Sequence, residues 1–408
     1  MKIVVHKYGG TSVASIERIR AVAKKVAAAA RSGDRIAVVV SAMAGETDRL
    51  IGLAREMSSE PMARDLDLLM ATGEQAAVAL LSLAIRNEGL DTETFLGFQA
   101  GIRTDSNHGR ARIEHIDATP VKAALDAGKV AIVAGFQGAT PQGAITTIGR
   151  GGSDTSAVAL AAAIGADHCE IFTDVDGVHA ADPRIVPTAR LLPKITYEEM
   201  MELADAGAKV LHARCVEIAA RFRVPLVVRS SFSAGEGTWV VPEEEQMEGA
   251  IVSGITCNTG EAKVAIRRVP DKVGVTAAIF APIAKAGINV DLIIQNVSED
   301  GYTDLTFTVP KEDLRRAMTL AENAAREVAA GRVEAAGDIA KISAVGLGMR
   351  SHAGVAHRMF EALAREGIAI QMIGTSEIKV SIVIDIKYAE LAVRVLHEAF
   401  GLSAGSVP

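Results

Sequence analysis

The sequence predicts a layered α/β fold with a mostly parallel sheet, followed by two copies of a ferredoxin-like unit. Up to about residue 240, short β-branched runs alternate with alanine-rich helical stretches, which is typical of α/β layers. Beyond that point a pattern of about 80 residues occurs twice, which indicates a duplicated unit. With 408 residues, 49% of them hydrophobic, the chain is long enough for two or three domains and is not a disordered protein.

The elements of the first part follow from the hydrophobic pattern and the turn residues. The apolar runs at 36–40 and 130–134 are typical of parallel strands buried on both faces. We expect strands at 3–5, 36–40, 130–134, 170–173 and 226–229, and helices at 15–30, 61–87, 120–127, 155–164 and 197–222. Gly165 should cap the helix at 155–164. The acidic, apolar-poor stretch at 242–246 indicates a domain boundary.

The second part repeats itself. Matching stretches are 263–266 and 341–344, 274–275 and 354–355, 287–288 and 367–368, and 303–309 and 378–384. The second pair should open a helix in each copy, and the third pair should start a strand. A further helix should begin at Lys311 or Lys387. Each copy therefore predicts a β-α-β-β-α unit, with or without a last strand.

Charge and cysteine usage exclude several classes of protein. The net charge of −7 without a Lys/Arg run argues against non-specific nucleic-acid binding, although a small polyanion can still bind to local cations and backbone amides. Cys169, Cys215 and Cys257 are widely spaced, so we expect buried reduced thiols rather than disulfides or a zinc site. We expect neither a signal peptide nor a membrane-spanning apolar stretch, and therefore a cytoplasmic protein.

Two glycine-rich stretches indicate a phosphate or carboxylate site, although the common P-loop and Rossmann motifs are absent. The stretch 7–12 (KYGGTS) follows the first strand, and its adjacent glycines and Lys7 suit a phosphate chain. A plain strand-to-helix turn remains the alternative. The stretch 149–156 (GRGGSDTS) opens a helix, so amide groups and the Arg150 fork face any ligand there. Asp154 either caps this helix or orders nearby lysines and a metal.

Further polar residues follow other strand ends or lie in apolar surroundings. The acidic loop at 173–184 follows a strand, where open α/β sheets bind ligands, or it is a plain surface turn. Ser41 and Thr47 follow the strand at 36–40. Glu74 lies in an apolar helical stretch and should meet a cation, because a buried unpaired carboxylate is costly. Each of these residues, like Lys209, is equally compatible with a structural role.

Taken together, these stretches resemble the aspartate kinases (aspartokinases), in the family's order and over essentially the whole chain. The repeat looks like the paired ACT domains of that family. Length and motifs are most similar to the short bacterial enzymes without a fused homoserine dehydrogenase. The resemblance implies a three-layer α/β/α amino-acid-kinase domain, Mg²⁺, and phosphorylation of the L-aspartate side chain by ATP. This reaction is the first step toward lysine, threonine and methionine.

The resemblance also implies a set of site residues. The implied catalytic residues are Lys7, Asp154 and Lys209. The ATP site would be formed by Lys7, Tyr8, Gly9, Gly10, Thr173, Asp174, His179, Ala180, Ala181, Asp182, Pro183, Arg184, Lys209 and Val210. Aspartate would be held by Ser41, Thr47, Glu74, Arg150, Gly151, Gly152, Ser153 and Asp154. No residue is implied as a dedicated metal ligand.

Regulation by lysine, threonine or both is implied through the ACT pair. The implied effector-binding residues are Asp271, Gly274, Val275, Asn289, Asp291, Gln295, Thr375, Ser376 and Glu377. The implied domains are the kinase domain (1–245), a linker or first regulatory strand (246–262), and ACT domains at 263–340 and 341–408. Met247 is a possible internal start, so the assembly is either a homo-oligomer or an α₂β₂ complex. The chain departs from the family at His179, usually Tyr, and at Gly374, more commonly Ser.

The chemistry of the implied reaction agrees with the residue types. The substrate carboxylate, with an unperturbed pKa near 3.9, is already ionised at neutral pH, so no general base is needed. The difficulty is to bring an anion to a polyanion, and cations and amides offset that repulsion. Two alternatives remain: a related kinase for glutamate, N-acetylglutamate, carbamate or a nucleotide, and a non-catalytic amino-acid sensor.

Overall fold

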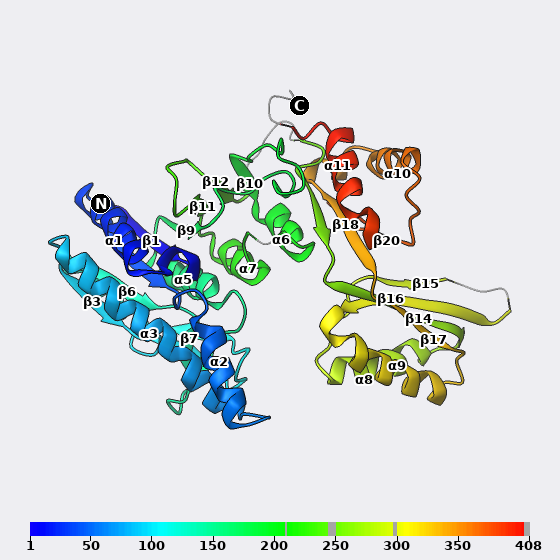
Figure 1. Ribbon diagram of the computed structural model, residues 1–408, viewed down its shortest axis with the longest axis horizontal. Coiled ribbons are helices and arrows are strands. Elements are labelled where there is room, and N and C mark those ends of the chain that lie inside the picture. The colour runs from blue at the N-terminus through cyan, green and yellow to red at the C-terminus, as the bar shows by residue number, and fades with distance from the viewer. Residues whose placement is uncertain (209, 244–249, 297–299, 404–408) are drawn as a thin grey trace. The chain divides into compact units, whose positions relative to one another are not determined.

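The computed structural model describes residues 1–208, 210–243, 250–296 and 300–403 (Figure 1). The chain divides into two compact units. The first consists of Met1–His179, Leu191–Asp205 and Lys209–Met247, and the second of Ala180–Arg190, Ala206–Ala208 and Glu248–Pro408.

The first unit is built on an eight-stranded sheet. Its strands are β1 (Ile3–Tyr8), β2 (Arg35–Val40), β3 (Thr92–Phe95), β6 (Val130–Ala134), β9 (His168–Thr173), β10 (Lys194–Thr196), β11 (Leu226–Ser230) and β12 (Thr238–Val241). They lie in the order β10-β12-β11-β9-β1-β2-β6-β3, and every pair except β11–β12 is parallel. All five strands expected in this part are present. A smaller sheet carries β4 (Ile102–Thr104), β5 (Ile113–Ile116), β7 (Gln137–Ala139) and β8 (Ile145–Thr147).

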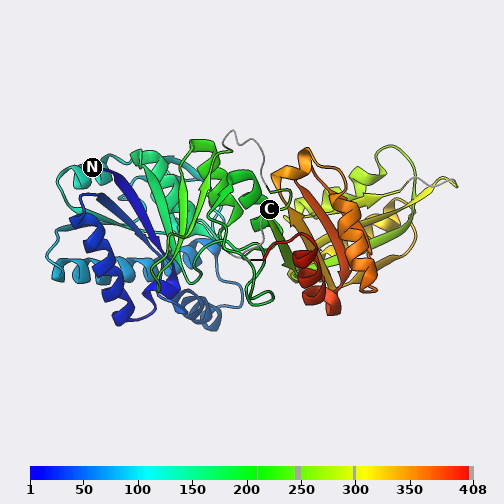
Figure 2. The same cartoon turned by 90° about the horizontal axis from the view of Figure 1, so that it is seen from above.

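Helices cover both faces of the large sheet, which confirms the expected three-layer fold (Figure 2). The helices are α1 (Ile16–Arg31), α2 (Glu46–Met57), α3 (Ala63–Asn87), α4 (Thr119–Asp126), α5 (Gly152–Ile164), α6 (Tyr197–Asp205) and α7 (Ala213–Phe222). α1 and α3 pack on the side chains of one face, such as Val4, Val38 and Ile132. α5 packs on β1, β2 and β9 and also contacts α7.

The boundaries of the helices have local causes. Ser15 precedes α1 in an extended conformation, and its side chain accepts a hydrogen bond from the Arg18 N–H at 3.3 Å. Gly165 ends α5 with a φ of +70°, as expected of a glycine C-cap.

α3 corrects the expectation that no apolar stretch is long enough to cross a membrane. It holds an 18-residue window of mean hydropathy 1.6, and 56% of that window is buried within the protein. A core helix of a soluble protein passes the same test of length and composition. The buried Ala77, Leu81 and Ile85 place α3 in the core of the first unit.

Two expectations about where helices and strands begin and end are wrong, and glycines with a positive φ explain both. The helix expected at 197–222 is two helices, because α6 ends at Asp205, Gly207 has a φ of +109°, and α7 begins only at Ala213. A φ in this range is unfavourable for other residues and incompatible with a helix. Gly287 and Gly367, with φ of +70° and +67°, follow helix ends instead of starting strands.

The second unit contains two four-stranded sheets. Its strands are β13 (Gly254–Asn258), β14 (Glu261–Pro270), β15 (Ile293–Gln295), β16 (Tyr302–Pro310), β17 (Val333–Ala336), β18 (Ile339–Val345), β19 (Met372–Thr375) and β20 (Lys379–Asp385). Its helices are α8 (Val275–Lys285), α9 (Leu314–Glu327), α10 (Val355–Arg365) and α11 (Ala389–Ala399). Short 3-10 turns of this unit lie at Lys311–Asp313, Leu347–Arg350 and Ile386–Tyr388, and a further one, Gly10–Val13, belongs to the first unit.

The pairing of these strands interleaves the two copies of the repeat. The sheets have the orders β15-β16-β14-β17 and β13-β18-β20-β19. The first copy thus carries its own fourth strand, β17. The second sheet is completed by β13, which precedes the first copy in the sequence and pairs antiparallel with β18.

Candidate active site

A cavity of about 380 Å³ opens at the carboxyl ends of β1, β2 and β6 and at the N-terminus of α5. It is lined by Lys7, Gly9, Gly10, Ser41, Ala42, Met43, Ala44, Gly45, Thr47, Asp48, Glu74, Phe136, Gly149, Arg150, Gly151, Gly152, Ser153 and Asp154. Segments from five separate parts of the sequence therefore meet here. Every residue that the sequence analysis assigned to aspartate lies among them. Ligands bind at this edge in open α/β sheets.

Lys7 is one of the two cations in the wall of the cavity, the other being Arg150. Side chains alternate along β1, so Lys7 lies on the face covered by α5, whereas Tyr8 lies on the opposite face. The Lys7 Nζ lies 2.5 Å from Asp154 Oδ1, at the first turn of α5. Lys7 is only 8% exposed, and a buried cation needs such a partner. The free N–H groups and the positive end of α5 add to the favourable site for an anion.

Two glycines are required by the geometry of the cavity wall. A Cβ on Gly10 would lie 2.9 Å from the Ala42 carbonyl oxygen, so only glycine lets the turn after β1 approach the loop after β2. Gly151 has a φ of +70°, and a Cβ there would lie 2.5 Å from the Cβ of His212. Both loops therefore present backbone, rather than side chains, to a ligand.

Glu74 is a buried carboxylate that reaches the cavity from α3. It is 3% exposed; its Oε1 accepts a hydrogen bond from the Ala42 N–H at 3.1 Å, and Oε2 has no hydrogen-bond partner. Burial raises the pKa of Glu74 to about 7, against the lowering effect of backbone hydrogen bonds. The expected cation is not found among the described residues. Glu74 can therefore accept a cationic group from a ligand.

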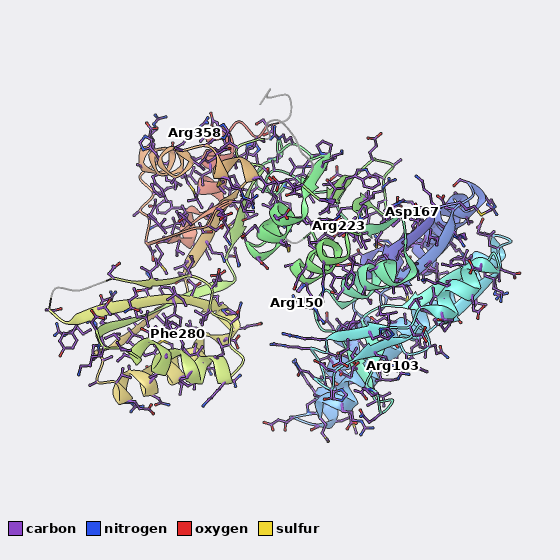
Figure 3. The ribbon with its side chains drawn as sticks, turned by 180° about the vertical axis from the view of Figure 1, so that it is seen from behind. Arg103, Arg150, Asp167, Arg223, Phe280 and Arg358 are labelled. Atoms are coloured by element: carbon purple, nitrogen blue, oxygen red, sulfur yellow. The ribbon has the colours of Figure 1, made fainter. Side chains whose placement is uncertain are left out.

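Arg150 differs from Lys7 in having no ion-pair partner within the described part of the chain. The side chain of Arg150 is exposed, and the residue lies just before the N-terminus of α5. Asp167 follows the C-terminus of the same helix (Figure 3). A free guanidinium beside a helix N-terminus is suited to a carboxylate or phosphate, which it can bind through two parallel hydrogen bonds.

The residues assigned to the nucleotide are more dispersed. The Tyr8 ring is fully buried and stacks on Phe172 at 4.7 Å between centroids, so only its backbone is available to a ligand. Thr173 is the last residue of β9, and its hydroxyl donates to Asp174 Oδ1 at 3.1 Å. The His179 Nε2 lies 2.8 Å from Asp176 Oδ1. Ala180–Arg184 belong to the second unit. Lys209 lies outside the described residues, and the half-buried Val210 follows it.

Sequence reasoning missed several lining residues, above all Phe136. This residue follows β6 and has a φ of +66°, which is rare and strained for a bulky side chain. Its backbone N–H donates to Ser156 Oγ at 3.2 Å, and its carbonyl accepts from the Ile148 N–H at 2.9 Å. A useful signal was available: Gly135 follows an apolar strand of the same sheet as Lys7. Met43 lies between Ser41 and Thr47, which the sequence had already indicated, and Asp48 follows Thr47 directly.

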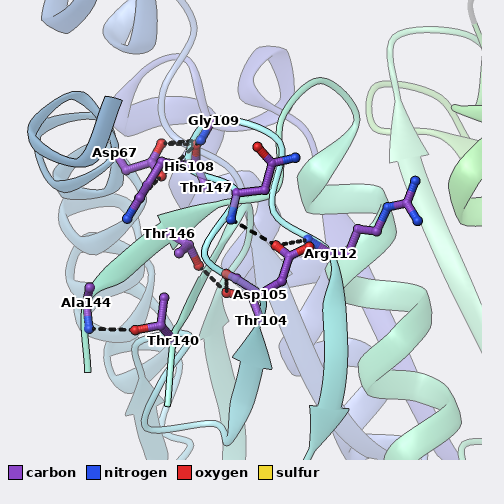
Figure 4. A network of polar contacts seen from close by, with 11 residues as sticks. Asp67, Thr104, Asp105, His108, Gly109, Arg112, Thr140, Ala144, Thr146 and Thr147 are labelled. Carbon is purple, nitrogen blue, oxygen red and sulfur yellow. Dashed lines mark hydrogen bonds and ion pairs between the residues drawn. The ribbon is translucent and has the colours of Figure 1, made fainter. Parts of the chain in front are cut away.

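A buried network supports the glycine loop from behind (Figure 4). Asp67 of α3 is fully buried and accepts hydrogen bonds from the Gly109 N–H and the Thr147 hydroxyl, while His108 Nδ1 lies 2.8 Å from its Oδ2. The segment around Gly109 is thereby held against β8. A Cβ on Gly149 would lie 2.9 Å from the Gly109 carbonyl, so this segment backs the start of the loop.

The residues assigned to an effector lie in the second unit. Asp291 forms an ion pair with Lys341, which also contacts Glu261. Gln295 accepts a hydrogen bond from Thr276 at 3.1 Å. Gly274 and Val275 lie at the start of α8, and the nearby Asp271 donates its backbone N–H to the Gly301 carbonyl. Asn289 is exposed. Thr375 ends β19, Ser376 follows it, and Glu377 forms an ion pair with Arg350.

Gly374, the second position at which the sequence departs from the related family, and the cysteines also have structural contexts. A Cβ on Gly374 would overlap Leu292 Cδ2, so any side chain there requires Leu292 to move. Cys169 and Cys215 are buried free thiols, as expected, and Cys257 is half-buried. No cluster of three or more metal-ligating side chains occurs among residues that the structure describes.

Comparison with protein families divides the chain into three matches. Residues 2–230 match the amino acid kinase family, and residues 264–325 and 342–400 each match an ACT domain. The first match alone covers more than half of the chain.

Individual relatives match over nearly their full length. The aspartokinase of Pseudomonas aeruginosa is 55% identical, over 99% of this chain and 98% of the relative. The aspartokinase of Corynebacterium glutamicum is 47% identical, over 98% and 97% respectively.

Among solved structures, E. coli aspartokinase III in complex with aspartate and ADP matches with a TM-score of 0.81 and 26% identity, over 98% of this chain and 99% of that one. The aspartate kinase from Synechocystis is 42% identical with a TM-score of 0.56, and covers 100% of this chain and 70% of its own.

Proposed function

The chain belongs to the aspartokinase family and is an aspartate kinase, and from this premise we propose that it transfers the γ-phosphoryl group of ATP to the side-chain carboxylate of L-aspartate in the cavity around Lys7. The observation that carries the site is the meeting of Lys7, Glu74 and Arg150 in one cavity. The aspartate and ADP bound to E. coli aspartokinase III support the choice of substrates.

The reaction needs positioning and charge neutralisation rather than proton transfer. An aspartate side chain is ionised at neutral pH, so its oxygen attacks the γ-phosphorus and ADP leaves without the help of a base. Lys7, the amides around Gly9 and Gly10, and the N-terminus of α5 reduce the repulsion between the two anions. Asp154 holds Lys7 in place by its ion pair.

The aspartate backbone groups are matched by two unpaired charges of the cavity. Arg150 binds the α-carboxylate, since its guanidinium has no carboxylate partner within the described residues. Glu74 binds the α-ammonium with its unpartnered Oε2. Ser41, Thr47 and the 151–153 stretch complete the wall.

The nucleotide is proposed to occupy the adjoining strand ends, with Tyr8 through its backbone, Thr173, Asp174, His179, Val210, the 180–184 loop and Lys209 as its contacts. The carboxylates present fit Mg²⁺ as a nucleotide-bound ion, because magnesium is commonly held by one or two carboxylates together with substrate phosphates. Asp154 is the carboxylate at the cavity suited to that role, and the ion would neutralise phosphate charge.

We propose that lysine, threonine or both inhibit through the ACT pair, at the assigned residues around Asp291 and Gln295. The ACT matches and the T-state structure of E. coli aspartokinase III with lysine and aspartate support this regulation. Inhibition would act as a shift between two states with different affinities for effector and substrate. Activity that does not change in millimolar lysine plus threonine would refute this regulation.

The remaining proposals concern context. We place the enzyme in the cytoplasm, at the first step toward lysine, threonine and methionine, with domains at 1–245, 263–340 and 341–408 joined by 246–262. It is a homo-oligomer or an α₂β₂ assembly with a separate subunit started at Met247, a residue outside the described ranges. A single full-length band on a denaturing gel contradicts the internal start.

A coupled assay of ADP release tests the substrate. We expect turnover with L-aspartate and at least about 10²-fold lower kcat/KM with L-glutamate and N-acetyl-L-glutamate. An added methylene misplaces the reacting carboxylate relative to the γ-phosphorus, and a blocked ammonium also leaves Glu74 without its cation. Comparable rates with either alternative would favour a related kinase. No turnover with any of the three would favour the amino-acid sensor.

A further inference from the structure

A second cavity lies within the first unit, away from the residues already assigned. It measures about 770 Å³ and is bounded by β5, the preceding segment from Asn107, α5 and α7. It shares no lining residue with the cavity around Lys7. Its size falls within the usual range for small-molecule sites, about 300–1,000 Å³.

The arginines around this cavity outnumber its acidic residues. Its lining includes Arg110, Arg112, Arg214 and Arg221, against two acids, Glu114 and Glu217. None of these guanidinium groups forms an ion pair with a carboxylate among the described residues, although the chain as a whole is acidic. Figure 4 shows the side chain of Arg112 pointing away from Asp105, and it is the backbone N–H of Arg112, not its guanidinium, that donates to Asp105 Oδ1 at 3.0 Å.

Arg214 is the inner cation of the group. It is half-buried and donates to the backbone carbonyls of Ile148 at 3.0 Å and Ala111 at 2.9 Å, without a carboxylate partner. Burial and the charge of Arg112 lower the pKa of Arg214, while Asp105 and Glu217 oppose that shift. Neighbouring guanidinium groups that repel each other are stabilised by an anion between them.

The other wall of the cavity is apolar. α5 contributes Ala159, Ala162 and Ala163, and α7 contributes Ile218 and Phe222, whose side chain is 57% exposed. An inorganic ion would leave this wall in water. The arrangement suits a molecule with an apolar body and at least one acidic group, because apolar burial and charge-assisted hydrogen bonds then act together.

We propose that this cavity binds an organic anion, a metabolite that carries carboxylate or phosphate on an apolar body. The guanidinium groups of Arg110 and Arg112 bind the acidic group, and the alanine face of α5 contacts the body. An occupant would also lie beside Arg214, whose partner Ile148 directly precedes the Gly149–Asp154 loop. A linked change in the KM for aspartate follows from this contact; only this consequence rests on the proposed function.

The binding test uses the full-length chain and anilinonaphthalene sulfonate, a fluorescent aromatic anion. Saturating ADP and L-aspartate keep the kinase site occupied. We expect one saturable site per chain in fluorescence and calorimetric titrations. Naphthoate and naphthyl phosphate should both displace the probe, and the stronger of the two identifies the preferred acidic group. Inorganic phosphate should compete at least about tenfold less well, because it gains nothing from the apolar wall.

Variants assign the site. The double change Arg110→Ala and Arg112→Ala should weaken probe binding at least about tenfold, and lysine at both positions should restore part of it. Arg20→Ala with Arg64→Ala, on exposed positions of α1 and α3, is the matched control and should bind as the wild type does. Circular dichroism and basal kcat should stay unchanged in both double variants.

Three results would overturn the proposal. These are no saturable binding to the wild type, equal affinity in the Arg110 and Arg112 variant, and an equal loss in the control variant. A failure of aspartate phosphorylation with intact probe binding would instead reject the proposed function and leave this site standing.

Discussion

The position of Lys7 at the end of a two-faced strand decides its role. Its neighbour Tyr8 lies on the opposite face of the sheet and is buried in the core. Because successive side chains of a strand point to opposite faces, a shift of one residue would exchange the cation in the cavity for this ring. We expect Lys7→Ala to lower kcat by about 10²–10³-fold with a much smaller rise in the aspartate KM, since the charge acts on the transferring phosphoryl group. Steady-state kinetics measures this split.

The matched control for this variant is Lys2→Ala, an exposed lysine just before the same strand. It should leave both constants unchanged. An unchanged kcat in Lys7→Ala would reject Lys7 as a group that stabilises the transition state.

Glu74 makes aspartate binding depend on pH. With its pKa near 7, the carboxyl is largely protonated below that pH and cannot attract an ammonium group. We expect kcat/KM for aspartate to fall toward about tenfold per pH unit below 7 and to level off above it. Glu74→Gln should raise KM about 10–100-fold and remove this limb of the profile. A wild-type limb that persists in the variant would assign the titration to another group.

The same carboxyl affects stability in the unliganded protein. Its pKa is raised on folding from about 4.5 to about 7, so its contribution is present below pH 4.5 and is lost as the pH rises toward 7. Glu74→Gln should therefore raise the melting temperature relative to wild type more at pH 8 than at pH 5. The largest difference is about 3 kcal/mol. Differential scanning calorimetry without aspartate measures it.

At the level of single residues, the sequence was informative where the chemistry lies in a contiguous motif. Lys7, Arg150 and Asp154 stand in glycine-rich stretches whose composition already indicates an anion site. Phe136 stands in no such motif: Gly135 indicates a turn after the apolar strand, but the left-handed backbone of Phe136 that brings it into the cavity wall is not visible in the sequence. The free oxygen of Glu74 likewise depends on the distance between α3 and the loop after β2.

α3 links the cavity to the network behind it, since Asp67 and Glu74 lie two turns apart on this helix. Asp67→Asn removes the charge that accepts from Gly109, His108 and Thr147. We expect a loss of about 2–3 kcal/mol of stability and a several-fold rise in the aspartate KM, with the KM for ATP and kcat less affected. Asp65→Asn, exposed on the same helix, should change none of these. Equal changes in both Michaelis constants would indicate a merely structural role.

The order of elements was more predictable than their breaks and partners. Apolar runs such as 36–40 and 130–134 identified the central strands, because a strand that is buried on both faces is apolar at every position. The break between α6 and α7 was missed, since the flanking stretches both carry helical periodicity and Gly207 alone marks the change. The partner of β13 could not be predicted, because its residues pair with residues of β18 that lie 83 to 91 positions away in the sequence.

At the scale of the whole molecule, the two sheets of the second unit are tied by a buried ionic cluster. Lys341, on β18 of the second sheet, is 4% exposed and contacts both Glu261 on β14 of the first and Asp291. Burial alone would lower the pKa of Lys341, but the two carboxylates raise it above its ordinary value. The cluster thus joins the repeat copies and holds Asp291, one of the proposed effector contacts.

Lys341→Met should therefore destabilise the second unit and not the first, by about 3–5 kcal/mol, because it leaves Glu261 buried without a cation. In a calorimetric scan, the transition of the second unit should move to lower temperature, while basal kcat and the first unit's transition stay in place. Adding Glu261→Met should recover part of the loss, since an apolar pair replaces a lone buried charge. Lys285→Met, exposed on α8, is the control. An equal shift of both transitions would show that the cluster supports the whole chain rather than one unit of it.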